Sequence, residues 1–254
     1  LRMLRDSPAA AERLSQLLSS SRPMTDLLED ASASIAWLDK VADLKPLGEE
    51  ALASEISSLL ARHEDAAEAM RAVRYLRRRE TLRTAMGWTL GIVDVEDTCA
   101  VLAAIDECTI GAALQIALRE LQAAPEGAEP AEAEETAGEK LLTRIAVIGM
   151  GRLGGAELGY GSDADVMFVC EPAPGVDDNE AVRWSIGVCD RMRRRLSKPS
   201  GDPPLEVDLG LRPEGRSGAV VRTIDSYVRY YEKWGETWEI QALLRATHIA
   251  GDKD

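Results

Sequence analysis

Aromatic side chains are scarce in this chain: phenylalanine, tryptophan and tyrosine together make up 4% of its 254 residues. Strands are normally enriched in aromatic and β-branched side chains, so this scarcity argues against an all-β protein. Alanine and leucine are abundant instead, and both favour helices. The composition therefore indicates a mainly helical protein whose length suits one large domain or two of medium size.

Long hydrophobic runs, paired cysteines and excess positive charge are also lacking. No apolar stretch approaches the roughly 20 residues of a membrane span, and the N-terminus has no signal-peptide core. The cysteines form no C-x-x-C pair and stand far from both histidines, so buried free thiols are expected, not a zinc cluster or disulfides. The net charge of −14 argues against nucleic-acid binding, which depends on cationic side chains. We therefore expect a cytoplasmic protein that contacts neither membranes nor nucleic acids.

The chain divides into three parts by composition. Residues 1–122 repeat apolar side chains at spacings of three and four, which predicts a helical domain. Residues 123–139 combine proline, glycine, alanine and glutamate without periodicity, which is typical of a flexible linker. In residues 140–254 we expect strands over 141–148, 163–170 and 205–211, a helix over 178–197, and helices again over 224–250. The predicted fold class is α+β, a helical domain followed by an α/β domain with a helical extension.

Two groups of side chains are interpreted as structural. The longest expected helix, over residues 63–86, carries the arginines Arg71, Arg74, Arg77, Arg78, Arg79 and Arg83. We interpret them as a solvated face paired with Glu68 and Glu80; a docking surface for an acidic partner is the alternative. A second group, Tyr230, Tyr231, Trp234 and Trp238, recurs at helical spacing and is interpreted as core.

Two aspartates separated by one residue, Asp163 and Asp165, open the strand expected over 163–170. Side chains two residues apart on a strand lie on the same face, so both carboxylates point toward one place. Adjacent carboxylates repel each other unless a cation lies between them, and oxygen ligands suit Mg²⁺ or Mn²⁺. A third carboxylate, Asp208, lies on the strand expected over 205–211. Three carboxylates on adjacent strands can hold two divalent ions roughly 3.5–4 Å apart, as in phosphoryl-type displacement.

The glycines between the first two expected strands allow another interpretation. Gly149, Gly151 and Gly154 have the spacing of a dinucleotide-binding fingerprint. That fold needs a crossover helix of about three turns, but further glycines interrupt the stretch that follows. Its parallel strands are also near-continuously hydrophobic, whereas the second strand here opens with two aspartates. A dinucleotide-binding module is therefore the weaker alternative.

The spacing from Gly151 through eleven residues to Asp163 and Asp165 resembles the signature of the nucleotidyltransferase superfamily that includes polymerase beta. Three blocks carry a closer resemblance: GMGRLGGAELGYGSDADVMF, VDLGLRPEGRSGAVVRT and YYEKWGETWEIQALLRATHIAGD. Together they resemble the family of bifunctional glutamine synthetase adenylyltransferase/adenylyl-removing enzymes, particularly its actinobacterial members. This resemblance implies that residues 140–254 form a polymerase-beta-like nucleotidyltransferase domain with the start of a C-terminal helical region.

The family has two related catalytic halves, one attaching AMP to a tyrosine of glutamine synthetase and the other removing it by phosphorolysis. AELGYGSD and TWEIQALLRA resemble the adenylylating half more closely. The resemblance thus implies AMP transfer from ATP to glutamine synthetase, with a PII signalling protein as a further candidate partner. The removing half and a nucleotidyltransferase for small molecules remain alternatives. The chain starts and stops within the family's pattern, so a fragment is expected.

The resemblance also implies roles for individual residues. Asp163 and Asp165 would coordinate the Mg²⁺ or Mn²⁺ that bridges the ATP phosphates, and Asp208 would share a second ion and act as general base. The implied nucleotide-binding residues are Gly151, Arg152, Gly154, Gly161, Ser162 and Arg212. Many members have arginine where this chain has Gly210, so any phosphate contact by that arginine would pass here to Arg212 or Arg216.

Overall fold

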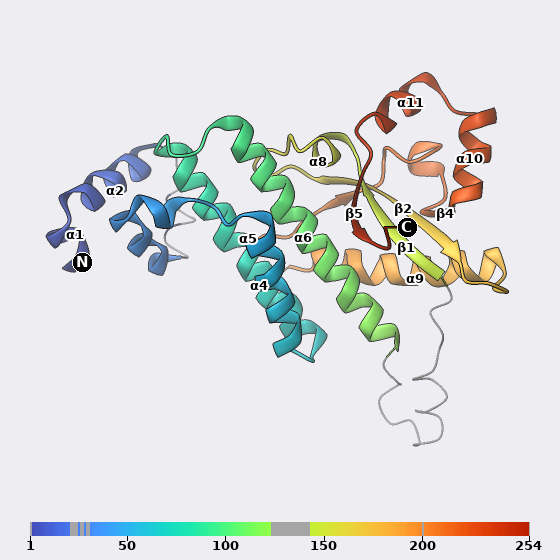
Figure 1. Cartoon of the computed structure of the whole chain (residues 1–254), viewed down its shortest axis with the longest axis horizontal. Coiled ribbons are helices and arrows are strands. Elements are labelled where there is room, and N and C mark those ends of the chain that lie inside the picture. The colour runs from blue at the N-terminus through green and yellow to red at the C-terminus, as the bar shows by residue number, and fades with distance from the viewer. Residues whose placement is uncertain are drawn as a thin grey trace, which may run out of the picture.

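The computed structural model describes residues 2–20, 25, 28, 31–122, 143–199 and 201–253. It is a mixed helix and sheet structure, as the predicted α+β class requires. The linker predicted over 123–139 lies outside the described residues. In Figure 1 the N-terminal helices form one side of the molecule and the sheet with the C-terminal helices forms the other.

The N-terminal side consists of helices: α1 (Arg2–Asp6), α2 (Pro8–Ser20), two 3-10 helices, η1 (Ser32–Asp39) and η2 (Val41–Leu44), then α4 (Glu49–Arg62), α5 (Ala66–Thr89) and α6 (Val95–Gln122). Helix α5 begins where the side chain of Asp65 accepts a hydrogen bond from the Glu68 amide, 2.7 Å away, an N-cap that satisfies a backbone donor. The helix predicted over 63–86 is thus present, but α6 is longer.

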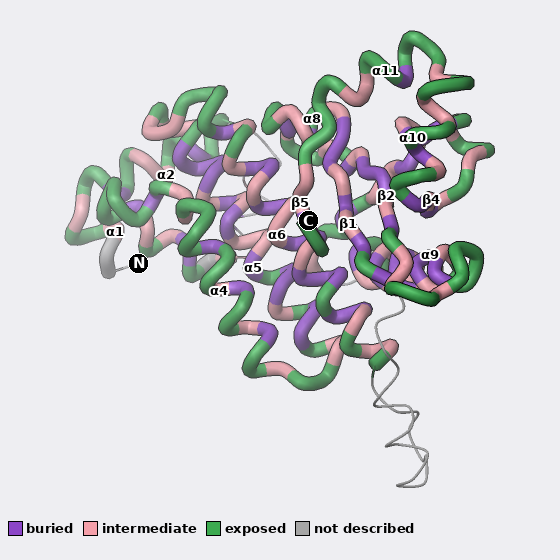
Figure 2. The backbone as a smooth tube through the Cα atoms, turned by 45° about the vertical axis from the view of Figure 1, so that its right-hand side comes forward, coloured by how far each residue is buried: buried purple, intermediate pink, exposed green. Residues whose placement is uncertain are grey.

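Helix α6 is the central element of the fold. By length and composition it could span a membrane, so the expectation that no stretch is long and apolar enough is wrong for α6. Its buried residues, however, belong to the main hydrophobic core, and it packs against α4 and α5 and also against α9 and β5. Figure 2 shows buried backbone running through α5, α6 and the strands. One core is therefore shared by the N-terminal helices and the sheet.

The arginines of α5 hold this arrangement together. Arg74 is 5% exposed and donates to the carbonyl oxygens of Lys198 and Asp202, beyond the end of α9. Arg77 Nε donates to Asp106 Oδ1 of α6 at 2.6 Å. Further along α5, Arg79 pairs with Glu55 of α4. The solvated-face interpretation is therefore wrong for Arg74 and Arg77. The expected pairing with Glu68 and Glu80 is confirmed, because Arg71 lies 3.7 Å from Glu68, and Arg79 and Arg83 lie 2.8 and 3.3 Å from Glu80.

The second part of the chain contains β1 (Thr143–Gly149), α8 (Gly151–Gly154), β2 (Ala164–Pro172), α9 (Asp178–Ser197), β3 (Val207–Asp208), η3 (Gly215–Ser217), β4 (Val221–Thr223), α10 (Ile224–Lys233), α11 (Thr237–Leu243) and β5 (Thr247–Gly251). The strand order is β3-β2-β1-β5, and β4 also pairs with β2. Strands β1 and β2 are antiparallel, with Val147 opposite Phe168. A dinucleotide-binding unit requires parallel strands joined by a crossover helix, so this topology argues against that alternative.

Two strands were missed by the sequence prediction. Helices were expected over 224–250, but β5 occupies the end of this range and pairs with β1. The three-residue strand β4 was also not expected. The strand predicted over 205–211 is shortened to Val207–Asp208. The helix predicted over 178–197 is confirmed as α9, which starts at the N-cap Asp177.

The aromatic residues of the C-terminal helices are only partly buried. Trp234 and Trp238 are 64% and 41% exposed, so the core interpretation is wrong for them. Tyr231 does pack in a small cluster with Met150, Met167 and Tyr227. The cysteines are free, as expected; Cys170 and Cys189 are buried and the other two are half-buried.

The hydroxyl of Tyr227 joins α10 to the sheet. It donates to the carbonyl oxygen of Phe168 in β2 at 3.1 Å, and burial raises the pKa of this phenol, which keeps it protonated. We expect Tyr227→Phe to lower the free energy of unfolding by about 1 kcal/mol, because the buried carbonyl loses a donor. Urea denaturation measures the difference. Tyr75→Phe, at an exposed position on α5, is the matched control, and equal losses for the two variants would contradict this role.

Candidate active site

Two of the predicted aspartates lie on two neighbouring parallel strands. Asp165 of β2 is directly opposite Asp208 of β3 in the strand register, and Asp163 precedes β2. The amide of Ala164 donates to the carbonyl oxygen of Glu206 at 2.9 Å, which fixes this register. The structure therefore brings Asp165 and Asp208 side by side, as the sequence predicted for strands carrying these residues.

The carboxylates influence one another electrostatically. The pKa of Asp165 is raised, first by partial burial and then by the negative charge of Asp208, with a smaller contribution from Asp163. Arg152 acts in the opposite direction and lowers this pKa. Negative charge is thus concentrated at this edge of the sheet, and one arginine offsets part of it.

Gly151 lies against Asp165. Its φ is +52°, and a Cβ at this position would be 2.6 Å from Asp165 Oδ2. The preceding amide, that of Met150, donates to the carbonyl oxygen of Asp165 at 2.8 Å. Only glycine combines this conformation with this close approach, so Gly151 lets the turn after β1 cover the carboxylate.

The other predicted glycines have different surroundings. A Cβ on Gly154 would be 2.0 Å from the carbonyl oxygen of Arg245, so Gly154 allows two backbone segments to touch. Gly161 has a φ of +68° and open space around it. A Cβ added at Gly159 would lie 3.9 Å from Arg152 Nη1 and 3.5 Å from Ser162 Oγ. Arg152 and Ser162 therefore face one loop.

A cavity of about 460 Å³ opens beside two of the aspartates. Its charged lining consists of Asp163, Asp208, Glu206, Arg193, Arg212 and Arg216. Asp165 and the predicted nucleotide-binding residues between 151 and 162 are not part of this lining. We call this space the carboxylate cavity. It places acidic and cationic side chains around one volume, an arrangement suited to a phosphate-bearing ligand with a bound cation.

The arginines of the carboxylate cavity differ in their freedom to bind a ligand. Arg212 is 7% exposed, and its guanidinium donates to the carbonyl oxygens of Leu209, Arg216 and Gly218 at 2.6, 3.0 and 3.1 Å. It therefore shapes the turn that follows β3. Arg216 is exposed, and its side chain forms no hydrogen bond or ion pair with the part of the chain that the structure describes. It remains a cation that a ligand can reach.

Arg193 is a site residue that sequence reasoning missed. It lies on α9 and lines the carboxylate cavity, where its Nε is buried without a hydrogen-bond partner among the described residues. Its nearest acidic partner is Asp190, 3.8 Å away on the same helix. The signal in the sequence was the basic end of the amphipathic helix, which by itself does not show which arginine faces the sheet.

Gly210 occupies a tight place beside Asp208. Its amide donates to Asp208 Oδ1 at 2.6 Å, and a Cβ here would be 3.0 Å from the same oxygen. An arginine at this position would crowd the carboxylate. Glycine leaves room here for the Asp208 carboxylate, and Arg193 and Arg216 supply positive charge nearby.

The carboxylates of Asp165 and Asp208 are suitable ligands for a divalent cation. Asp165 and Asp208 stand in register, repel each other and offer oxygen ligands of the kind that Mg²⁺ and Mn²⁺ prefer. Within the described part of the chain, no three His, Cys, Asp or Glu side chains are gathered as a ready metal-binding group.

A sequence model of glutamate-ammonia ligase adenylyltransferases matches residues 11–254. The chain belongs to this adenylyltransferase family. Curated relatives named bifunctional glutamine synthetase adenylyltransferase/adenylyl-removing enzyme are similar along its length: that of Corynebacterium efficiens is 51% identical over 100% of the chain, and that of Mycolicibacterium smegmatis 48% over 98%. The chain spans 24% of the length of each. The family resemblance drawn from the sequence blocks is confirmed.

Proposed function

We propose that this adenylyltransferase family member transfers AMP from ATP to a tyrosine hydroxyl of glutamine synthetase, releasing pyrophosphate, in the cytoplasm. The observation that carries the proposal is the pairing of Asp165 with Asp208 beside a cavity that also contains Asp163, Arg193 and Arg216. The names of the relatives supply the chemistry and the protein substrate. The expected PII signalling partner stays a prediction.

Asp208 is the proposed general base. A tyrosine hydroxyl has a pKa of about 10 and is a weak nucleophile at neutral pH unless a base removes its proton. In the proposed reaction the phenolic oxygen forms a bond to the α-phosphorus of ATP, the bond from that phosphorus to the bridging oxygen breaks, and pyrophosphate leaves. The phenolic proton passes to Asp208. Asp208 lines the cavity and is held by the Gly210 amide, so its position is defined before substrate binds.

The remaining charges are assigned to phosphate binding. Mg²⁺ or Mn²⁺, held by Asp163, Asp165 and Asp208, would neutralise the carboxylates and polarise the phosphate oxygens. Arg193 and Arg216 are proposed to bind phosphate oxygens directly, because charge-assisted hydrogen bonds from guanidinium groups to phosphate are strong. Gly151, Arg152, Gly161 and Ser162 are proposed to line the rest of the nucleotide site. Gly154 and Arg212 are proposed to support it through backbone packing.

The proposed catalytic unit is a polymerase-beta-like nucleotidyltransferase domain over residues 140–254, preceded by the helical domain 1–122. It is supported by the glycine turn between the antiparallel strands β1 and β2 and by the carboxylates paired across β2 and β3. The helices pack on this unit through the shared core. They are therefore proposed to fix the sheet in place.

An assay of both reactions of the family tests the assignment. Purified glutamine synthetase, ATP and Mg²⁺ are incubated with the chain, and pyrophosphate release is measured. We expect release that depends on glutamine synthetase. Release with small alcohols or amines alone would favour the small-molecule alternative. Formation of ADP from adenylylated glutamine synthetase and inorganic phosphate, without pyrophosphate release in the first assay, would identify the removing half.

The contact of Gly151 with Asp165 gives a separate prediction. In Gly151→Ala the added methyl group would collide with Asp165 Oδ2. Both the backbone strain at a positive φ and the displacement of the Asp165 carboxylate should lower the rate of AMP transfer. We expect AMP transfer to fall about tenfold to a hundredfold, the equivalent of about 1–3 kcal/mol of local strain. The measurement is the initial rate at saturating ATP.

Gly175→Ala is the matched control for this prediction. Gly175 also has a positive φ, +86°, but nothing lies within 4 Å of an added Cβ, and it stands in the turn between β2 and α9. This variant carries the backbone strain without the collision at Asp165. An equal loss of rate in both variants would show that strain alone, not the position of Asp165, accounts for the effect.

A further inference from the structure

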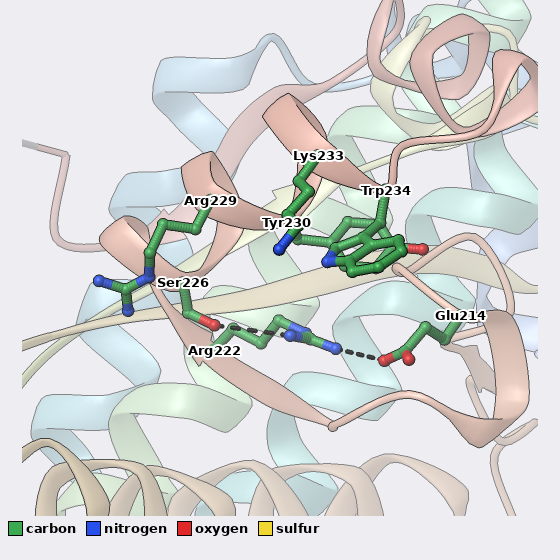
Figure 3. A pocket seen from close by; sticks show the side chains of 7 residues that line it. All are labelled: Glu214, Arg222, Ser226, Arg229, Tyr230, Lys233 and Trp234. Carbon is green, nitrogen blue, oxygen red and sulfur yellow. Dashed lines mark hydrogen bonds and ion pairs between the residues drawn. The ribbon is translucent and has the colours of Figure 1, made fainter.

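A second cavity, separate from the carboxylate cavity, lies against helix α10. It has a volume of about 650 Å³ and is shown in Figure 3. We call it the α10 cavity. Its charged lining consists of the cations Arg222, Arg229 and Lys233 and one carboxylate, that of Glu214. The two cavities have no lining residue in common, so the α10 cavity is not an extension of the proposed active site.

The charge of the α10 cavity is opposite to that of the chain. The chain carries a net charge of −14, yet three cations and one carboxylate surround this space. Neither Arg229 nor Lys233 forms a hydrogen bond or ion pair with the part of the chain that the structure describes; the ammonium of Lys233 lies 5.0 Å from the ring centroid of Trp234. Two cations without acidic partners beside one volume favour an anionic ligand.

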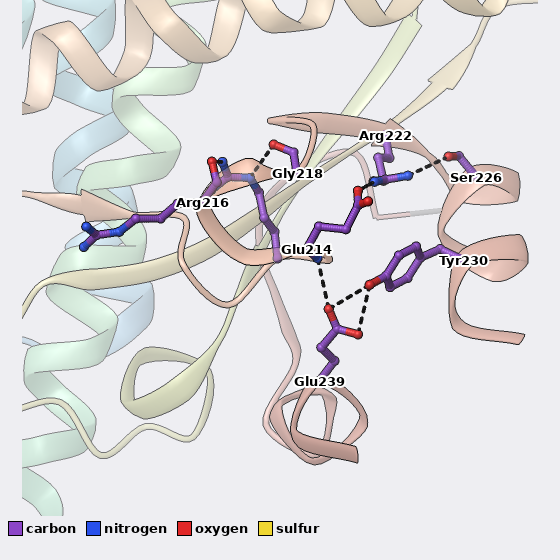
Figure 4. A network of polar contacts seen from close by, with 8 residues as sticks. Glu214, Arg216, Gly218, Arg222, Ser226, Tyr230 and Glu239 are labelled. Atoms are coloured by element: carbon purple, nitrogen blue, oxygen red, sulfur yellow. Dashed lines mark hydrogen bonds and ion pairs between the residues drawn. The ribbon is translucent and has the colours of Figure 1, made fainter. Parts of the chain in front are cut away.

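Arg222 is already held in position for such a ligand. Its Nη2 donates to Glu214 Oε2 at 2.5 Å and its Nη1 to Ser226 Oγ at 3.5 Å. Its guanidinium carbon lies 5.2 Å from the ring centroid of Tyr230, and its Nε is buried without a partner among the described residues. Figure 4 shows these contacts. A guanidinium fixed on several sides loses little freedom on binding and matches the oxygens of a phosphate.

The exposed ring of Trp234 indicates the second part of the ligand. This indole is 64% exposed at the edge of the cavity. Planar bases stack on aromatic side chains, and indole offers the largest such surface. We propose that the α10 cavity binds a nucleoside phosphate, with the phosphate on Arg222, Arg229 and Lys233 and the base on Trp234. The cavity volume lies within the range of about 300–1,000 Å³ of small-ligand sites.

The position of Glu214 connects the α10 cavity to the carboxylate cavity. Its amide donates to Glu239 Oε1 at 3.0 Å, and the same carboxylate accepts a hydrogen bond from the hydroxyl of Tyr230. Two residues further along the same turn, Arg216 lines the carboxylate cavity. A phosphate that competes with Glu214 for Arg222 therefore acts on the turn that carries Arg216. This coupling, unlike the binding site itself, rests on the proposed function.

Calorimetric titration of the whole chain with AMP in the presence of EDTA tests the binding site. We expect the double variant with Arg229→Ala and Lys233→Ala to bind AMP about tenfold or more weakly, because two charge-assisted contacts are lost. The double variant with Arg183→Ala and Arg194→Ala removes the same charge from exposed positions of α9 and should bind like the unmodified chain. Trp234→Ala should weaken binding of AMP but not of inorganic pyrophosphate.

Several results would overturn this proposal. These are an unmodified chain that binds neither AMP nor pyrophosphate, equal losses in the two double variants, and AMP binding that is lost in Asp163→Asn but kept without Arg229 and Lys233. Thermal midpoints establish that each variant is folded. The coupling is tested separately: AMP should change the rate of AMP transfer in the unmodified chain and not in the Arg229/Lys233 variant. An unchanged rate would refute the coupling while the binding result stands.

Discussion

Replacing Asp163 or Asp208 with asparagine is expected to lower the rate of AMP transfer by about 10²- to 10³-fold, the loss typical of one electrostatic contact to a transition state. Asparagine has nearly the same shape but carries no charge, so it is a poorer ligand for a divalent cation and cannot act as a base. Asp163 is exposed, and the contact of Asp208 with the Gly210 amide can be kept by the amide oxygen of asparagine. The thermal midpoint should therefore stay nearly unchanged.

The rate is measured with saturating ATP and glutamine synthetase, and the midpoint by circular dichroism. Asp225→Asn, at an exposed position in the first turn of α10 and outside the carboxylate cavity, is the matched control and should retain the rate. A folded Asp163→Asn or Asp208→Asn variant with the activity of the control would show that these carboxylates are not part of the catalytic machinery.

The largest loss of stability is expected for Gly154→Ala. A Cβ at this position would be 2.0 Å from the carbonyl oxygen of Arg245 and 2.3 Å from that of Gly149. Both atoms belong to the backbone and cannot rotate away, so the segment before β5 would have to move from the end of β1. The hydrogen bond from Thr247 Oγ1 to the carbonyl oxygen of Gly154, 2.9 Å long, would move with it. We expect a loss of about 3 kcal/mol.

Denaturation in urea measures this loss. Gly201→Ala is the control, because nothing lies within 4 Å of a Cβ at Gly201. This variant should change the free energy of unfolding by less than about 0.5 kcal/mol. A Gly154→Ala variant as stable as this control would mean that β1 and the segment before β5 are not in close contact.

The placement of two candidate aspartates on neighbouring strands could be predicted because it depends on local sequence patterns. The Asp-x-Asp spacing at the start of a strand and an aspartate on a later strand were enough to expect the pairing of Asp165 with Asp208 seen in the register. The close approach of Gly151 to Asp165 explains why a glycine precedes the aspartates at this distance. The helix over 178–197 was predicted because its amphipathic pattern is local.

Features that depend on distant parts of the chain were not predicted. Strand β5 exists because it pairs with β1, about a hundred residues earlier, and its own sequence has no strong strand pattern. Arg74 is buried and Arg77 is largely covered because the loop after α9 and helix α6 supply acceptors for them. Arg193 lines the carboxylate cavity because α9 packs against β2. Local periodicity contains no information about these contacts.

The most direct test of the proposed AMP transfer is to follow a phosphate label from ATP to glutamine synthetase. The chain is incubated with Mg²⁺, glutamine synthetase and ATP labelled either at the α- or at the γ-phosphate, and the modified protein is digested and sequenced. We expect only the α-label to reach glutamine synthetase and to sit on a tyrosine, and we expect Asp208→Asn to lower its transfer by about 10²- to 10³-fold. Transfer of the γ-label, or equal transfer of the α-label by Asp208→Asn, would contradict this proposal.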